Sequence, residues 1–220
     1  MRLETLLRIM ISPPSPISNP WRDRLLSAVS RFESGVASLE INGYRPPGDE
    51  LYRPNKTAAV LVPVLDLEEP EVVLTRRADH LVQHPGQVSF PGGAAETGDE
   101  SAVQTALREA FEEIGLPADR TTPIGFLDRM DTVSDYRVLP VVALVQWPVV
   151  WKLDYSEVAE VFTVPLSVAL DRERYTPKSV KREGREFITW SMEWGTQKIW
   201  GATAAMLLNL ADRIELASRG

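Results

Sequence analysis

The sequence has no cysteine and only two histidines among its 220 residues, and these absences narrow the possible chemistry. Without cysteine there is no disulfide framework, no thiolate nucleophile and no cysteine-ligated zinc or iron–sulfur site. With only His80 and His84, a metal site built from several histidines is disfavoured as well. Any metal must be held mainly by carboxylate oxygens, which favours a hard cation such as Mg²⁺ or Mn²⁺.

The sequence also lacks long basic runs and long apolar segments. Its 24 Lys+Arg stand against 31 Asp+Glu, giving a formal net charge of -7, which argues against a surface that coats nucleic acid. No segment approaches the roughly 20 apolar residues that a membrane span needs. Near the start of the chain, Glu4 and Arg8 interrupt an apolar stretch that has no small-residue cleavage site. We therefore expect a cytoplasmic protein without a nucleic-acid or membrane partner.

The length and composition predict one domain with an appendage. A chain of this length with 44% hydrophobic residues can bury one sizeable core. Residues 1–19 contain Pro13, Pro14 and Pro16, which predict an extended, proline-rich N-terminal arm. Residues 20–220 are then expected to form a single domain that includes an N-terminal and a C-terminal helix.

Strands and helices alternate along the chain, which indicates an α/β or α+β layered domain. Ser101 and Gln104 have the form of a capping box, and Gly115 supplies a helix C-cap, so one helix is especially well bounded. Helices are expected at about 21–32, 101–114 and 202–216, and strands at about 58–65, 72–75, 88–90, 139–145, 161–164, 187–190 and 198–200, the last two as a hairpin across Trp194 and Gly195.

The helix predicted at 101–114 separates apolar from acidic side chains. Carboxylates three or four residues apart on a helix lie roughly 5–6 Å apart and repel, so a divalent cation would turn their repulsion into coordination. The alternative is a solvated acidic face with Arg108 offsetting Glu112, which taken alone is the more common case. At about 100° per residue, the apolar side holds Val103, Leu107, Ala110, Phe111 and Ile114, and the acidic side holds Glu109, Glu112 and Glu113.

A glycine-rich passage just upstream favours the metal site over the solvated face. Phe90, Pro91, Gly92 and Gly93 end a loop that can approach the acidic side, because glycine accepts positive φ and close backbone contact. Loop carbonyls would complete the oxygen shell of a cation.

These residues together resemble the box of the Nudix hydrolase family, Gly-x5-Glu-x7-Arg-Glu-U-x-Glu-Glu-x-Gly-U, in which U is a bulky apolar residue. Ala94 stands at the position of the first glycine, one residue past Gly93, and Ala110 stands where a larger apolar residue is usual. The resemblance implies an α/β/α sandwich with a mixed β-sheet and a central metal-binding loop-helix. The matching residues are Glu100, Arg108, Glu109, Glu112, Glu113, Gly115 and Leu116.

The stretch 73–93 is similar to the signature of the coenzyme A branch of that family, although Val82 replaces a second arginine. The resemblance extends through segments 157–166 and 199–204, and covers roughly residues 55–210. It implies Mg²⁺- or Mn²⁺-dependent hydrolysis of coenzyme A or acyl-CoA to 3′,5′-ADP and 4′-phosphopantetheine or its acyl form. The matching residues are Leu74, Thr75, Arg77, Ala78, Gly86, Phe90, Pro91, Gly92 and Gly93.

The resemblance assigns roles to individual residues. Arg108 is expected to orient the carboxylates by a salt bridge, and the general base is expected to be Glu112 or a loop acid, Glu157 or Glu160. The expected metal ligands are Glu109, Glu112, Glu113 and Gly93. The catalytic candidates are Glu109, Glu112, Arg108 and Glu160, and the substrate-binding candidates are Arg76, Arg77, Gly86, Gln87 and Phe90.

Two other functions stay open at this point. One is a Nudix hydrolase for ADP-ribose, NADH or a dinucleoside polyphosphate, which Val82 keeps in view. The other is a nucleotide-sensing module without catalysis, which the three helix acids argue against. The tryptophans and prolines outside the box also suggest a homodimer.

Overall fold

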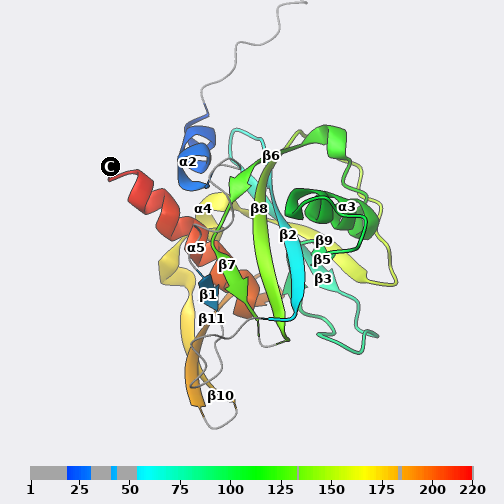
Figure 1. Ribbon diagram of the computed structural model, residues 1–220. Helices are drawn as coiled ribbons and strands as arrows, with labels where there is room; N and C mark the ends of the chain where they lie inside the picture. Colours follow the sequence, from blue (N-terminus) through cyan, green and yellow to red (C-terminus); the bar gives the residue numbers. More distant parts are fainter. Residues whose placement is uncertain (1–18, 31–40, 44–53, 133, 183–184, 220) are drawn as a thin grey trace, which may run out of the picture.

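A mixed sheet of nine strands forms the centre of the computed structural model, which describes residues 19–30, 41–43, 54–132, 134–182 and 185–219 (Figure 1). A second sheet has three strands. The strands are β1 (Ile41–Gly43), β2 (Lys56–Leu65), β3 (Glu71–Arg77), β4 (Val88–Ser89), β5 (Gly92–Ala94), β6 (Thr121–Phe126), β7 (Arg129–Asp131), β8 (Tyr136–Val145), β9 (Val158–Pro165), β10 (Thr176–Arg182), β11 (Arg185–Trp194) and β12 (Gln197–Trp200). The helices are α2 (Pro20–Ala28), α3 (Ala102–Ile114), α4 (Leu166–Ala169), α5 (Gly201–Ala217) and the 3₁₀ turns Ala118–Arg120 and Arg172–Arg174.

The parallel pair β2–β8 is the axis of the large sheet. Its register runs without a break from Lys56 opposite Tyr136 to Leu65 opposite Val145. The strand order is β1-β7-β8-β2-β3-β4, with β5 also on β2, β6 on β8 and β9 on β3, and the small sheet has the order β10-β11-β12. Both central strands are rich in valine and leucine, which is typical of strands covered on both faces.

Helices cover the two faces of the large sheet, with α3 on one side and α2 and α5 on the other (Figure 1). Each side has its own apolar core, because neighbouring residues of a strand point to opposite faces. On the α3 side, Ala110 and Ile114 pack with Leu61 and Val141. On the α5 side the core includes Leu207, Leu210, Val62 and Val142. This arrangement is the α/β/α sandwich with a mixed sheet that the sequence predicts.

The first described helix is shorter than expected. It begins at Pro20 with Asn19 as N-cap and ends at Ala28, because Val29 turns to an extended conformation and Ser30 bridges to Phe126. The prediction of helix through residue 30 was therefore wrong, and residues 31–32 lie outside the described part of the chain. Strand pairing with β6 outweighed the helical spacing of the apolar residues.

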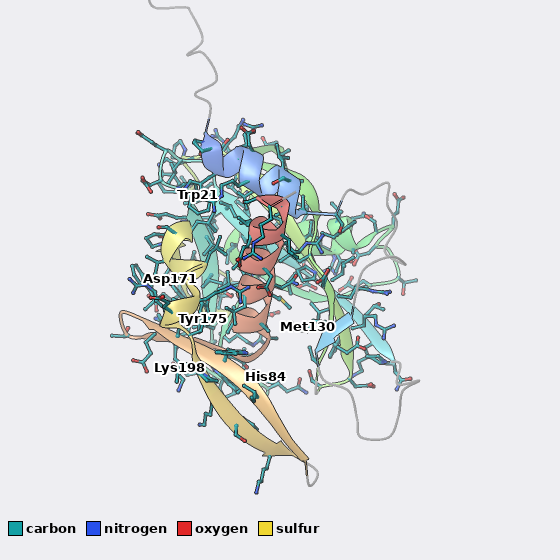
Figure 2. The ribbon with its side chains drawn as sticks, turned by 90° about the vertical axis from the view of Figure 1, so that its left-hand side faces the viewer. Trp21, His84, Met130, Asp171, Tyr175 and Lys198 are labelled. Carbon is teal, nitrogen blue, oxygen red and sulfur yellow. The ribbon has the colours of Figure 1, made fainter. Side chains whose placement is uncertain are left out.

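The small sheet and α5 close the α5 side of the molecule. The predicted hairpin is confirmed as β11–β12, with Gly195 at φ 58 in its turn. Figure 2 shows α2, with Trp21 labelled, beside one end of α5, and the β10–β11 ribbon projecting past the other end. Thr203 in the first turn of α5 donates a hydrogen bond to the Val88 carbonyl, which ties this helix to β4. None of the helices in the described ranges is long and apolar enough to cross a membrane.

Candidate active site

A glycine turn lies directly against helix α3. In β5, Gly93 pairs with Ala59 of β2, and Gly92 pairs with Val60. A Cβ atom added at Gly93 would lie 2.5 Å from the carboxylate of Glu109, and one added at Gly92 would lie 2.5 Å from the Ala59 carbonyl oxygen. Only glycine therefore lets this strand lie between β2 and the acids of the helix.

Helix α3 has the predicted limits because both of its ends are capped. Ser101 accepts a hydrogen bond from the Gln104 amide, and Gly115 ends the helix in a left-handed conformation. The Gln104 side chain accepts from the amide of Glu100, one residue before the position that a capping box would use. The C-terminal carbonyls of Glu113 and Ile114 accept hydrogen bonds from the amides of Asp154 and Lys152, so the end of the helix is fixed to the following loop.

The acids of α3 differ sharply in exposure. Glu113 is 4% exposed, the Glu109 side chain 16% and the Glu112 side chain 56%. The predicted division of the helix into faces was wrong at two positions, since Glu113 is buried and Phe111 is 61% exposed. The buried stripe of the helix follows Ala106, Ala110 and Glu113, which have the i, i+4, i+7 spacing of a single face.

Negative charge near Glu113 is only partly compensated. Burial raises the pKa of Glu113 to about 8, the charges of Glu109 and Glu157 act in the same direction, and Arg77 and the Gly92 amide oppose them. The amide of Gly92 lies 3.3 Å from Glu113 Oε2. Burial also raises the pKa of Glu109 above its ordinary value, and Arg108 opposes that shift. Such a buried cluster of acids favours the approach of a cation.

Arg108 connects the loop to two acids of the helix. Its Nη1 atom donates to Glu109 Oε1 and to Glu112 Oε2, each at 3.0 Å. Its Nη2 atom donates to the Ala94 carbonyl at 3.1 Å. Arg108 therefore forms salt bridges with both acids, and its predicted role of orienting them stays a prediction.

Asp99 holds the other side of the Arg108 guanidinium, and sequence reasoning missed it. Asp99 accepts from Arg108 Nε at 3.1 Å and from Nη2 at 3.0 Å, and its side chain is 5% exposed. The Arg108 hydrogen bonds hold the pKa of Asp99 well below its usual range. Counting Gly-x5 forward from Gly93 leads to Asp99, whereas counting back from Arg108 leads to Glu100. The extra loop residue was the signal that could have identified Asp99.

The two neighbouring arginines of β3 lie on opposite faces of the sheet. Val73 packs on the α3 side and Leu74 on the α5 side, so alternation puts Arg77 with the acids and Arg76 away from them. The positive charge of Arg77 opposes the rise in the pKa of Glu113. Within the described ranges, the buried Nε atom of Arg77 has no hydrogen-bond partner. Beside the acids, Arg77 therefore carries a buried polar atom that the described residues leave without a hydrogen bond.

Glu160 and Glu157 are separated in the same way. Glu160 lies opposite Arg76 in the β3–β9 register, 3.5 Å from Arg76 Nε, and accepts from Gln197 Nε2 at 2.8 Å. Glu157 lies where the loop reaches β9, and its carbonyl accepts from the Ala78 amide at 2.8 Å. Because its charge acts on Glu109 and Glu113, Glu157 is the loop acid that the fold brings to the helix.

The remaining substrate-binding candidates divide between the loop and the core. The Gln87 carbonyl accepts from the Arg77 amide at 3.0 Å, and Gly86, at φ 66, adjoins it. The structure therefore places Gly86 and Gln87 beside Arg77. Phe90 is 3% exposed in the α5-side core, so packing explains its presence in the sequence pattern.

The donor chemistry of this site fits a hard divalent cation. Its acids offer only oxygen ligands, and Glu113 is a carboxylate whose pKa is raised by burial and, to a lesser extent, by the neighbouring acids. Among the residues that the structure describes, no three acidic or histidine side chains are already gathered as a metal cage. Glu109 and Glu112 are instead held by Arg108.

Comparison with known proteins identifies similar chains. The NUDIX domain family matches residues 55–190. An uncharacterized Nudix hydrolase, NudL, of Yersinia pestis (strain Pestoides F) is 42% identical over 165 residues, which cover 74% of this chain and 81% of that protein. A MutT protein of known structure from Methanosarcina mazei Go1 is 20% identical, with a TM-score of 0.47 over 77% of this chain and 96% of that one.

Proposed function

The chain belongs to the Nudix hydrolase family, which acts on phosphoanhydride bonds, and from that premise we propose that it hydrolyses the diphosphate of coenzyme A or an acyl-CoA. The observation that carries this proposal is Arg77, which lies beside the acids of α3 and has a buried Nε atom with no hydrogen-bond partner among the described residues. Arg77 belongs to the stretch 73–93 that resembles the coenzyme A signature.

The proposed ligands of a Mg²⁺ or Mn²⁺ ion are Glu109, Glu112 and Glu113, with the Gly93 carbonyl. Such an ion, when bound, polarises phosphoryl oxygens and makes a coordinated water more acidic. The Arg77 guanidinium binds the diphosphate by charge-assisted hydrogen bonds and places it over the acids. Arg108 positions Glu109 and Glu112, to which it donates hydrogen bonds.

Glu157 is the proton acceptor that this geometry favours for the attacking water. It is exposed, and its charge acts on both Glu109 and Glu113. Glu160 is engaged by Arg76 and Gln197 on the other face of the sheet, which suits a structural role. Glu112 remains an alternative base because its side chain is 56% exposed.

One observation supports a second candidate within the family. Val82, at the position of the second arginine of the coenzyme A signature, is 98% exposed and offers a phosphate no charge. A substrate without the 3′-phosphate, such as ADP-ribose or NADH, would lose nothing by that replacement.

Product identification separates these substrates. The full chain is incubated with coenzyme A and Mg²⁺ in ¹⁸O-water, and the products are analysed by mass spectrometry. We expect 3′,5′-ADP and 4′-phosphopantetheine, with one ¹⁸O atom in the product whose phosphorus was attacked. The values of kcat/KM for coenzyme A, acetyl-CoA, ADP-ribose and NADH are then compared. A higher value for ADP-ribose or NADH would overturn the coenzyme A assignment and leave the family intact.

A further inference from the structure

An apolar groove lies along strand β9 of the large sheet, between that strand and the loop that carries Trp147 and Trp151. Its volume is about 440 Å³, and its lining includes Leu65, Leu67, Trp147, Trp151, Val161 and Phe162. Glu71 of its lining is at the end of β3 opposite Arg77, and Val161 pairs with Thr75, two residues before Arg77. None of the residues that line the groove belongs to the proposed active site.

The groove is unusually rich in aromatic surface for a position outside the core. Trp147 is 51% exposed, Trp151 is half-buried, and Val150 on the same loop is 79% exposed. Aromatic-lined grooves of this kind recognise proline-rich segments in the polyproline II conformation, because the segment is already extended before it binds.

The sequence carries such a segment, and the first described residue after it lies at the groove. Residues 12–18 read Ser-Pro-Pro-Ser-Pro-Ile-Ser, so Pro13 and Pro16 have the PxxP spacing. The described chain starts at Asn19, whose Nδ2 atom donates to the carbonyl of Leu67 at 2.8 Å. Leu67 is a lining residue of the groove, so the segment joins the folded chain at the rim.

The geometry at Asn19 is also compatible with an extended approach. Asn19 has φ -87 and ψ 105, an extended conformation that the following Pro20 favours. Arg22 pairs with Asp66 at 3.4 Å, which fixes the start of α2 to the same turn. Seven residues of polyproline II span roughly 20 Å, enough to cross the groove from this point.

We propose that residues 12–18 of this chain bind in the groove lined by Trp147, Trp151 and Leu67, with their prolines against the tryptophan rings. The proposal is independent of the catalytic assignment, because it uses none of the residues of the proposed active site.

The absence of cysteine makes a direct test possible, since one introduced cysteine can be labelled uniquely. The full chain is produced with 5-fluorotryptophan, and the Trp147 and Trp151 signals are assigned with Trp147→Phe and Trp151→Phe. A nitroxide is attached to Ser15→Cys, and ¹⁹F intensities are compared before and after reduction of the nitroxide. We expect Trp147 and Trp151 to lose most of their intensity while the label is paramagnetic.

Two control variants show whether the loss of intensity is specific to the Ser15→Cys label and whether it depends on the prolines. A mixing experiment shows whether it arises within one molecule. A nitroxide on Lys181→Cys, in the exposed β10 strand, should leave Trp147 and Trp151 unchanged. Replacing Pro13, Pro14 and Pro16 by serine in the Ser15→Cys chain should restore their intensity, with an unchanged circular dichroism spectrum. Full intensity with the Ser15→Cys label would overturn the proposal. In mixtures of nitroxide-labelled chains and fluorinated chains, the Trp147 and Trp151 signals should keep their intensity. If they broaden only in such mixtures, the segment binds a second copy of the chain, and the proposal is overturned.

Discussion

At the Arg77 end of β3, each face of the sheet carries an arginine and a glutamate, but the two glutamates differ in burial and in their hydrogen-bond partners. On the α5 side, Glu160 is close to Arg76 and to an amide of Gln197. On the α3 side, Glu113 is 4% exposed, and burial raises its pKa to about 8. An acid that already has its partners stabilises the fold locally, whereas a buried acid among other acids is suited to a ligand that brings positive charge.

Replacing Glu113 by Gln should remove the difference between the two glutamates, and we expect it to reduce activity more than any other variant considered. The amide keeps the shape of the side chain and removes a proposed metal ligand, so we expect kcat/KM to fall roughly 100-fold, equivalent to about 2.7 kcal/mol of transition-state stabilisation. The melting temperature without metal should not fall, because a buried group that resists ionisation is replaced by a neutral one. Steady-state hydrolysis and thermal unfolding measure the two effects.

The matched control is Glu160→Gln on the other face. It weakens a partly exposed ion pair with Arg76, so kcat/KM should remain within about twofold and stability within about 1 kcal/mol. Equal losses of activity in the two variants would remove the distinction between the faces and return Glu160 to the catalytic group.

Gly93→Ala should have the next largest effect. Its Cβ would lie 2.5 Å from the carboxylate of Glu109, so either that side chain or β5 must shift. We expect activity to fall about 10- to 100-fold, because small displacements of reacting groups are costly. Gly98→Ala is the control, since nothing lies within 4 Å of a Cβ there, and it should retain full activity. Unchanged activity in Gly93→Ala would show that the close contact does not position Glu109.

Replacing Asp99 tests which loop residue supports the α3 site. Asp99→Asn weakens both hydrogen bonds that Arg108 donates to it, and we expect about tenfold lower kcat with little change in KM. Glu100→Gln alters the residue that the box pattern selects, and it should be nearly silent because Glu100 is exposed. A larger loss in Glu100→Gln than in Asp99→Asn would reverse the assignment.

The smallest of the predicted effects concerns the stability of the Asp99→Asn chain at acidic pH. Hydrogen bonds from Arg108 lower the pKa of Asp99 below the ordinary 3.8, so Asp99 stabilises the fold above that pH and loses this contribution as the pH falls below it. The Asp99→Asn chain should therefore lose less stability on acidification than the parent chain. Urea midpoints measured from neutral pH to below 3.8 test this, and parallel acid limbs would contradict it.

Periodicity predicted those parts of the fold that depend on local sequence. The capped helix α3 and the apolar strands β2 and β8 contain their own signals, and each lies close to its expected range. Strands β5 and β7 were not predicted, because each has three residues, too few for a periodic pattern, and forms by pairing with a longer strand, β5 with β2 and β7 with β8. Helix α2 ended early for the same reason, since Ser30 pairs with Phe126.

The candidate site was predictable as a set of residue types but not as an arrangement. Spacing selected Arg108, Glu109, Glu112 and Glu113, and their placement on one helix follows from sequence. The burial of Glu113 depends on β5 and β9, which sequence does not place. The separation of Arg76 from Arg77 depends on strand alternation relative to a helix that is distant in sequence.

The unbroken register of β2 with β8 has a consequence for the order of folding. These strands pair from Lys56 with Tyr136 to Leu65 with Val145, so their junction closes a loop of about 80 residues that contains α3. Local helix formation is fast, whereas pairing across such a separation is slow, because the entropy of loop closure is lost before the contacts form. The acids of α3 thus lie together on a nascent helix early, and the chain becomes competent for catalysis only when its two central strands meet.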